Sequence, residues 1–419
     1  MKKSELQLKT DAALINQSKP TKRILEVALT APEASGSRDA VPLNLALVID
    51  RSGSMSDGKL EQVKVAVSQI LDLLRPADSV SIIDYDDRIS VTAESGSVTP
   101  AAREEMKQAV RYLEPRGATD LGGGWLRGCE CAARHQSTSR ISRALLLTDG
   151  LANQGITDAL ELQQHASALF ERGIATSTFG VGEDFNEHLL EGMANHGGGN
   201  YYYIDSRQRI PELLLQEFKD LAAATLIGVN LELTFPAAVA YELFGEWRVE
   251  KSDDRHVVVN LSDLAAGRTV NLFLNLLAPP GNGELVIKAA VSGMDEAHKP
   301  FLLEGEVMLR YADTAEVALA EEKRDQDMVT RYSSVVVGQV TNQALKLERA
   351  GKFAEAGNMM DMLMLEHETS LPISTRERYQ RIRSEIREGL DEPRRKNYQN
   401  DSYNLKRHRH EDQKREAGK

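Results

Sequence analysis

The chain has little cysteine, no excess of basic residues and no long apolar run. Its 419 residues include two cysteines, Cys129 and Cys131, which lie two positions apart in a predicted helix and therefore point to different faces, so a disulfide between them is not expected. The net charge of −12 argues against nucleic acid as a partner. No run reaches the length of a membrane span, and the first ten residues lack the apolar core of a signal peptide. We therefore expect a cytoplasmic protein with no membrane span.

The glycine-rich segments lack the motifs of nucleotide binding. Neither Gly122–Gly124 nor Gly180–Gly182 is followed by Gly-Lys-Ser or Gly-Lys-Thr, and no Gly-x-Gly-x-x-Gly follows the first predicted strand of the α/β region. We interpret these glycines as places where the backbone turns tightly.

One apolar run ends abruptly in three oxygen-bearing side chains. The run Leu45–Ile49 is followed by Asp50, Ser52 and Ser54. Buried parallel strands are continuous apolar runs, and ligands of open α/β sheets lie just beyond the carboxyl ends of the strands. Carboxylate and hydroxyl oxygens are hard ligands that suit Mg²⁺, Mn²⁺ or Ca²⁺. The pattern therefore places a candidate metal site at the end of this strand.

Two later segments repeat the pattern. The run Ala144–Thr148 ends in Asp149, and the glycine-rich loop 117–124 offers the hydroxyl of Thr119. Taken singly, an Asp or Ser after a strand is usually a helix N-cap or a turn former. Three such segments in order favour a shared site instead.

Asp50-x-Ser52-x-Ser54, followed by Thr119 in a Gly-x-Thr loop and Asp149 in Thr-Asp-Gly, resembles the metal-ion-dependent adhesion site (MIDAS) of a bacterial-type von Willebrand factor A (VWA) domain. The resemblance covers about residues 41 to 225. It implies that Ser52, Ser54 and Thr119 coordinate the metal directly. It also implies that Asp50 and Asp149 act largely through bound waters.

The chemistry of these residues favours binding over catalysis. Two carboxylates leave one divalent cation roughly neutral, and an acidic side chain from a partner is a natural further donor for a hard cation. We therefore expect an intracellular, non-catalytic interaction or regulatory module. Its Mg²⁺, or Mn²⁺ or Ca²⁺, would bridge to an exposed Asp or Glu of a partner protein. The sequence specifies no oligomeric state.

Two other functions stay open. The first is a metal-dependent hydrolase or phosphatase; no His stands near Asp50 or Asp149 in the sequence, and neither a Cys-His nucleophile pair nor a second metal cluster is evident. The second is an adaptor subunit of an ATPase machine, which rests on analogy between folds alone. We expect that the protein is not an enzyme.

The chain divides into several regions by its patterns. Strands alternate with helices over 41–226, which predicts a doubly wound, mostly parallel, Rossmann-like α/β sheet. Apolar and polar residues then alternate in short runs, which predicts an antiparallel β-sandwich over 227–312. Residues 313–390 have a helical pattern. Residues 391–419 contain nine Lys or Arg and six Asp or Glu, and are interpreted as a charged, disordered tail.

The N-terminal segment 1–40 contains one apolar run, Arg23 to Ala31, that is typical of a strand. We expect it to join the β-sandwich, so that the VWA domain is inserted between sandwich strands. The alternative is that it extends the edge of the VWA sheet.

A few polar and apolar clusters permit two interpretations. Asp84 to Asp87 could touch the rim of the ligand site or form a turn, and we favour the turn. Asp120 could accept hydrogen bonds beside the metal ligands or cap the helix that begins at Leu121. The methionines between Met359 and Met364 could form an adaptable partner groove but are more often helical core.

Overall fold

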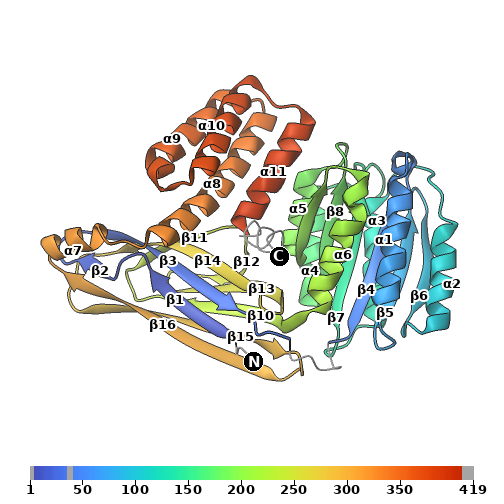
Figure 1. Cartoon of the computed structure of the whole chain (residues 1–419), viewed down its shortest axis with the longest axis horizontal. Coiled ribbons are helices and arrows are strands. Elements are labelled where there is room, and N and C mark those ends of the chain that lie inside the picture. The colour runs from blue at the N-terminus through green and yellow to red at the C-terminus, as the bar shows by residue number, and fades with distance from the viewer. Residues whose placement is uncertain (1–3, 35–40, 408–419) are drawn as a thin grey trace.

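The structure is a computed structural model that describes residues 4–34 and 41–407 (Figure 1). It has three parts: an α/β unit at the right of the figure, two further sheets at the lower left, and a group of helices above them formed by the C-terminal residues.

The α/β unit is built on a six-stranded sheet with the order β6-β5-β4-β7-β8-β9. Neighbouring strands of this sheet run parallel, except that the edge strand β6 runs antiparallel to β5. The central strands are buried throughout because both faces of the sheet are covered, as expected for a parallel sheet. The strands are β4 (Leu43–Asp50), β5 (Ser79–Tyr85), β6 (Ile89–Ser95), β7 (Ile141–Thr148), β8 (Ile174–Val181) and β9 (Gly198–Ile204).

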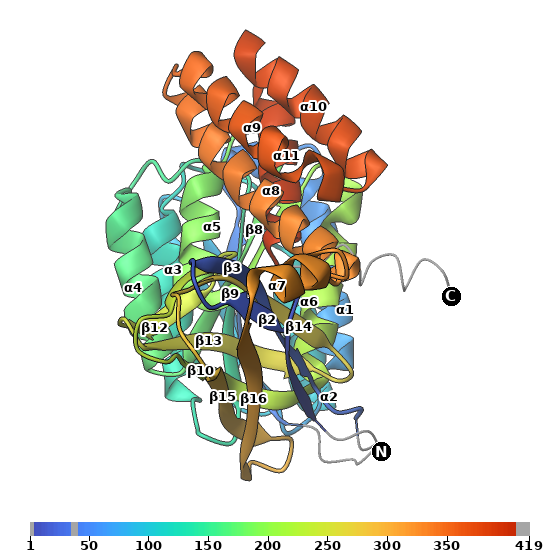
Figure 2. The same ribbon diagram turned by 90° about the vertical axis from the view of Figure 1, so that its left-hand side faces the viewer.

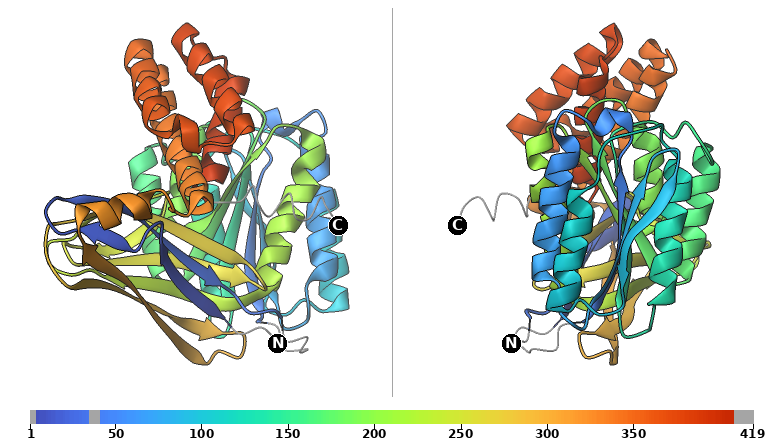
Figure 3. Two further views of the ribbon diagram at one scale, coloured as in Figure 1. Left: turned by 60° about the vertical axis from the view of Figure 1, so that its left-hand side comes forward. Right: turned by 90° about the vertical axis from the view of Figure 1, so that its right-hand side faces the viewer.

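Helices cover both faces of this sheet (Figure 3). Alternate residues of β4 point to opposite faces: Leu45 and Leu47 join one buried cluster, whereas Ala46 and Val48 join another. The first cluster includes side chains of α1 (Lys59–Leu73), α2 (Pro100–Arg111) and α6 (Ile210–Ala222). The second includes side chains of α3 (Leu121–Arg134), α4 (Ala159–Glu171) and α5 (Glu187–His196). The predicted doubly wound α/β fold is confirmed.

The interpretation of Gly122–Gly124 as a tight turn is wrong. These glycines form the first turn of α3, where the helix packs closely on the sheet. A Cβ atom on Gly124 would lie 2.4 Å from Cγ of Tyr85, so the helix can approach β5 only because that atom is missing. Of the other segment, Gly180 lies within β8, and only Gly182, with a φ of 74°, supports a turn.

Two further sheets contribute side chains to one buried apolar cluster. The four-stranded sheet has the order β1-β3-β14-β11, and the six-stranded sheet has the order β12-β13-β10-β15-β16-β2. The first is formed by β1 (Glu5–Thr10), β3 (Thr21–Thr30), β14 (Thr269–Ala278) and β11 (Ala240–Phe244). The second is formed by β12 (Arg248–Ser252), β13 (His256–Ala265), β10 (Ala224–Thr234), β15 (Glu284–Asp295), β16 (Pro300–Ala312) and β2 (Leu14–Asn16).

The second of these sheets is mixed, whereas the sequence predicted antiparallel strands alone. The short strand β2 runs parallel to β16, with Leu14 opposite Arg310 and Asn16 opposite Ala312. A strand of three residues is too short to produce an alternation pattern, so the sequence could not predict this pairing.

The apolar run at Arg23 to Ala31 forms most of β3, which pairs with β14 from Thr21 opposite Ala278 to Thr30 opposite Thr269. Its other neighbour is β1, so β3 lies inside the four-stranded sheet and is not part of the α/β sheet. The elements from β4 to α6 therefore stand in the chain between two strands, β3 and β10, that belong to the other sheets.

The C-terminal part of the chain is helical, as predicted. Figure 2 shows its long helices grouped on one side of the β sheets. The methionine segment lies on α9 and is core in part: Met360 and Met364 are buried, Met359 is half-buried and Met362 is exposed. The helices are α7 (Thr314–Glu321), α8 (Gln326–Arg349), α9 (Phe353–His367), α10 (Ile373–Glu388) and α11 (Glu392–Lys406).

The predicted disordered tail over 391–419 is wrong for the part that the structure describes, because residues 392–406 form α11. This helix packs on α8 and contacts the α/β unit at β9. Two of its lysines are buried in ion pairs: Lys396 lies 3.0 Å from Glu187, and Lys406 lies 3.0 Å from Glu191. Composition counts such charges but does not reveal partners that are distant in sequence. Residues 408–419 of the predicted tail lie outside the described residues.

Among the described helices, none combines the length and the apolar character that crossing a membrane requires.

Candidate metal site

The carboxyl edge of the α/β sheet brings together most of the predicted site residues. Asp50 is the last residue of β4, and Asp149 directly follows β7, the strand paired with β4. Ser52 and Ser54 lie on the loop after β4, where a short 3-10 helix spans Gly53–Met55. Parallel neighbours end at the same edge of a sheet, so residues distant in the chain meet there.

Hydrogen bonds join four of the five predicted residues. Ser54 Oγ donates to Asp149 Oδ1 at 2.6 Å, and the hydroxyls of Ser54 and Ser52 are 3.1 Å apart. The backbone N–H of Ser52 donates to Asp50 Oδ1 at 2.8 Å. Thr148 Oγ1 donates to Asp50 Oδ2 at 2.6 Å, which ties the ends of β4 and β7 together.

Thr119 reaches the same place from the loop before α3. Its N–H donates to Asn153 Oδ1 at 3.0 Å, and the N–H of Asn153 donates back to the Thr119 carbonyl at 3.2 Å. A Cβ atom on Gly150 would lie 3.6 Å from Thr119 Oγ1 and 3.7 Å from Ser54 Oγ. The hydroxyls of Thr119 and Ser54 therefore both lie within 4 Å of the position that a Cβ atom of residue 150 would occupy.

The two carboxylates of the cluster are withdrawn from water. Asp50 and Asp149 each have an exposed fraction of 0%. Burial raises the pKa of Asp50 to about 6, against the hydrogen bonds from Ser52 and Thr148, and the nearby charge of Asp149 raises it further. The surroundings of Asp50 therefore disfavour its charged form in the protein alone.

Sequence reasoning missed Lys59, which contacts the cluster. Its Nζ lies 2.5 Å from Asp149 Oδ2 and donates to the Ser54 carbonyl at 3.3 Å. Lys59 opens α1 after a turn at Asp57 and Gly58, whose φ angles are 57° and 81°. The local sequence does not distinguish Lys59 from Lys64, the other lysine of this helix, because the residue that Lys59 contacts, Asp149, comes from the segment after β7.

The donor set fits a hard divalent cation. Ser54 directs its proton to Asp149, which leaves the lone pairs of its oxygen available to a metal. Over residues 4–34 and 41–407 there is no group of three or more His, Cys, Asp or Glu suited to a metal. A cation held here would therefore depend on the hydroxyl oxygens, which is compatible with Mg²⁺, Mn²⁺ or Ca²⁺ and not with a soft metal.

The neighbouring acidic residues have structural partners. Asp84 lies within β5 and pairs with Arg51 at 3.1 Å, while Asp86 pairs with Arg116 and accepts from the N–H of Arg88. Asp120 accepts from the N–H of Gly123 at 2.9 Å and caps α3. The turn lies at Asp86 to Arg88, because Asp84 and Tyr85 are still paired strand residues; the predicted turn is therefore correct for Asp86 and Asp87 and wrong for Asp84. The contact of Asp120 agrees with a capping role.

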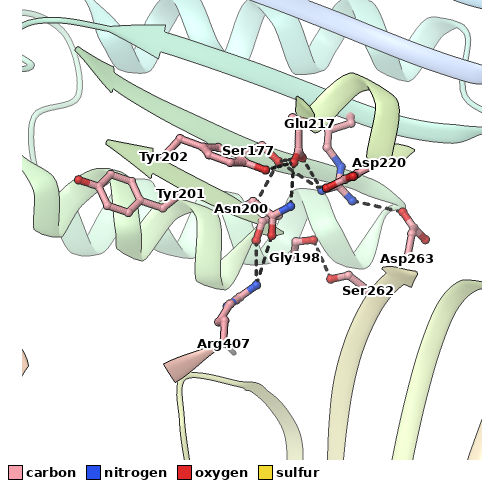
Figure 4. A network of polar contacts seen from close by, with 12 residues as sticks. Ser177, Gly198, Asn200, Tyr201, Tyr202, Glu217, Asp220, Ser262, Asp263 and Arg407 are labelled. Carbon is pink, nitrogen blue, oxygen red and sulfur yellow. Dashed lines mark hydrogen bonds and ion pairs between the residues drawn. The ribbon is translucent and has the colours of Figure 1, made fainter. Parts of the chain in front are cut away.

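A second buried polar network lies where the α/β unit meets β13 (Figure 4). Glu217 of α6 is fully buried, yet Arg143 at 3.3 Å and three hydrogen-bond donors hold its pKa below the usual value against the effect of burial. Arg143 also pairs with Asp263 of β13 at 3.2 Å, so one arginine links the two units. The donors to Glu217 are Ser177, Asn200 and Tyr202.

Comparison with known proteins agrees with this geometry. Residues 44–216 match the family described as von Willebrand factor type A domain, so the chain contains a VWA domain. The whole fold is similar to a von Willebrand factor type A protein from Catenulispora acidiphila, with a TM-score of 0.68 and 18% identity over 88% of this chain and 87% of the other. The ArnB paralog VWA2 from Sulfolobus acidocaldarius gives a TM-score of 0.62 and 18% identity, over 97% and 98% of the two chains. These likenesses concern the fold.

Curated relatives share part of their length with this chain. The protein named "Uncharacterized protein YfbK" from Escherichia coli is 31% identical over 263 residues, which are 60% of this chain and 44% of that protein. The human inter-alpha-trypsin inhibitor heavy chain H3 is 32% identical over 244 residues, or 56% of this chain and 26% of that protein. The chain thus spans less than half the length of both relatives.

Proposed function

We propose that the VWA domain binds one divalent cation and uses it to hold an acidic side chain of a partner protein. Ser52, Ser54 and Thr119 would ligate the cation, and Asp50 and Asp149 would act largely through waters. The proposal rests on one observation: hydrogen bonds at the carboxyl edge of the sheet connect Asp50, Ser52, Ser54 and Asp149.

The chemistry of the cluster supports Mg²⁺, with Mn²⁺ and Ca²⁺ as alternatives. Mg²⁺ is bound through few protein carboxylates and keeps several waters, which matches two buried carboxylates beside neutral hydroxyls. A carboxylate from another protein is the ligand that a hard cation would accept in place of one water. The net charge of −12 repels an acidic partner, so the attraction has to be local to the metal.

We propose a binding role without catalysis. The described side chains that hydrogen-bond to the five residues are hydroxyls, one amide and Lys59, and neither His nor Cys is among them. A metal-dependent hydrolase needs a group that activates or protonates a reacting atom. Cys129 and Cys131, both free and buried, support a cytoplasmic setting.

The proposal is tested by affinity capture with the full chain as bait, in Mg²⁺ and in excess chelator. A specific partner should be retained in Mg²⁺, lost in chelator and lost with Asp149→Ala. Replacement of single Asp or Glu residues of the captured partner by Asn or Gln should reveal one position that abolishes binding. A complex that persists undiminished in chelator contradicts the metal bridge.

A further inference from the structure

Lys59 places a positive charge within the cluster that is proposed to hold the metal. The Nζ atom approaches the side of Asp149 that Ser54 does not use: Ser54 donates to Oδ1, and Lys59 contacts Oδ2 at 2.5 Å. The lysine is about one-quarter exposed, whereas Asp149 is fully buried. The ammonium thus reaches inward from the surface to a carboxylate that has no exposed area of its own.

The charges around the cluster show what this contact does. Asp50 and Asp149 supply two negative charges to a buried site, and Lys59 supplies one positive charge. Desolvated carboxylates are costly when unpaired, so the ammonium stabilises the protein without metal. The same ammonium repels a divalent cation placed among these ligands.

We infer that Lys59 is the internal counter-cation of the site, which compensates Asp149 in the metal-free protein and opposes the binding of a divalent cation. The inference rests on the proposed function, because it concerns the same ligands. Metal affinity is then a balance between the attraction of two carboxylates and the repulsion of one ammonium.

This arrangement couples the metal to the acidic partner. With Lys59 present, two carboxylates and one divalent cation leave one net positive charge in the site instead of a neutral centre. A carboxylate from the partner cancels that charge. Metal and partner should therefore bind more tightly together than separately, and the acidic ligand should lower the Mg²⁺ concentration that fills the site.

The test is a calorimetric titration of Mg²⁺ and Mn²⁺ into the full chain and into Lys59→Met and Lys59→Gln. Both variants remove the positive charge. The glutamine side chain can still donate a hydrogen bond to Asp149, so Lys59→Gln serves as the test protein if Lys59→Met does not fold. The metal dissociation constants should fall about tenfold or more. Lys64→Met is the matched control, because Lys64 lies on the same helix and pairs with Glu61, which is two-thirds exposed. Its dissociation constants should stay within about twofold of the parent.

Thermal melts provide a second readout. Without metal, both Lys59 variants should melt below the parent, and saturating Mg²⁺ should raise their midpoints more than it raises the midpoint of the parent. Equal metal affinities in the parent and in the Lys59 variants would overturn the inference and leave the metal site intact. If neither the parent nor any variant binds metal, the proposed function fails and the inference fails with it.

Discussion

The Nζ atom of Lys406 lies 3.0 Å from Glu191 and 2.5 Å from Glu246, with no exposed surface on the lysine side chain. The contact joins the last turn of α11 to α5 of the VWA domain and to the segment before β12. A buried cation between two carboxylates therefore fixes the C-terminal helix against the domain that carries the proposed metal site.

Lys406→Met should be strongly destabilising. The substitution leaves Glu191 and Glu246 without their cation, and breaking a buried pair in this way costs about 3–5 kcal/mol. Urea unfolding of the full chain measures the loss. Lys352→Met is the control, since Lys352 pairs with Glu355 and both are exposed by more than half; its effect should stay below about 1 kcal/mol. Equal losses of unfolding free energy for the two substitutions would show that the buried ion pairs of Lys406 do not contribute much to stability.

His188 should make the protein less stable in mild acid. Burial lowers its pKa to about 4, while Glu187 acts in the opposite direction. In the unfolded chain the pKa of a histidine is about 6.5, so the unfolded chain takes up a proton at a higher pH than the folded protein does. The free energy of unfolding is therefore unaffected by His188 above about pH 6.5 and decreases as the pH falls from about 6.5 toward 4. Between about pH 7.5 and pH 5.0 the parent should lose about 1–2 kcal/mol more than His188→Gln.

Comparison of the two proteins isolates the imidazole, because other groups such as Glu191 titrate in both. Urea unfolding at the two pH values supplies the four free energies. A parent and variant with parallel pH dependence would mean that His188 is protonated as easily in the folded protein as in the unfolded chain.

Gly124→Ala should destabilise the VWA domain although alanine favours helices. The new methyl group would lie 2.4 Å from Cγ of Tyr85, so α3 or β5 must move. Overpacking of this kind costs about 1–3 kcal/mol. The matched control is Ala133→Gly, at an exposed position of the same helix, which should cost about 1 kcal/mol from helix propensity alone. Urea unfolding compares the two, and a Gly124→Ala variant more stable than the parent would show that the close approach to Tyr85 is not required.

Local sequence patterns were sufficient for the parallel strands of the VWA sheet and for the residues of its carboxyl edge, but not for the antiparallel edge strand β6. Asp50, Ser52 and Ser54 stand directly after a continuous apolar strand, and the strand ending at Thr148 is followed by Asp149, so pattern and spacing alone bring them near one another. Lys59 could not be predicted, because its significance comes from a contact with a residue distant in the chain.

The ordered state of α11 escaped prediction for the same reason. The charges that suggested a solvated tail belong in part to Lys396 and Lys406, whose buried partners are Glu187 and Glu191 of α5. These partners lie about two hundred residues away in the chain, where no local pattern reveals them.

Short and edge elements were also beyond the sequence patterns. β2 has three residues, and β12 is mostly exposed and rich in charge, so neither gives an alternation signal. The helix α2 begins at Pro100, where Thr99 accepts a hydrogen bond from the N–H of Ala102. None of the residues of its first turn is buried, so the apolar pattern that marks a helix in the sequence begins only with Met106.

Asp50→Ala and Asp149→Ala should each abolish metal binding and leave the fold intact. The apolar strands β4 and β7 do not change, and removing Asp50 removes a desolvated charge. Removing Asp149 leaves Lys59 without this partner, but Lys59 is about one-quarter exposed and can turn to solvent. Circular dichroism and thermal melts in chelator report the fold, and calorimetry reports the metal. If either variant fails to fold in chelator while the parent folds, that carboxylate is a structural residue.

The most direct measurement of the central claim is the thermal midpoint of the full chain as a function of Mg²⁺ concentration, with Asp149→Ala beside it. A cation that binds the native state alone stabilises it by about 2.7 kcal/mol at a hundredfold excess over its dissociation constant. The midpoint of the parent should therefore rise steadily with Mg²⁺, while that of Asp149→Ala stays constant. A parent whose midpoint is the same in millimolar Mg²⁺ and in chelator, with no heat of binding by calorimetry, would contradict the metal site.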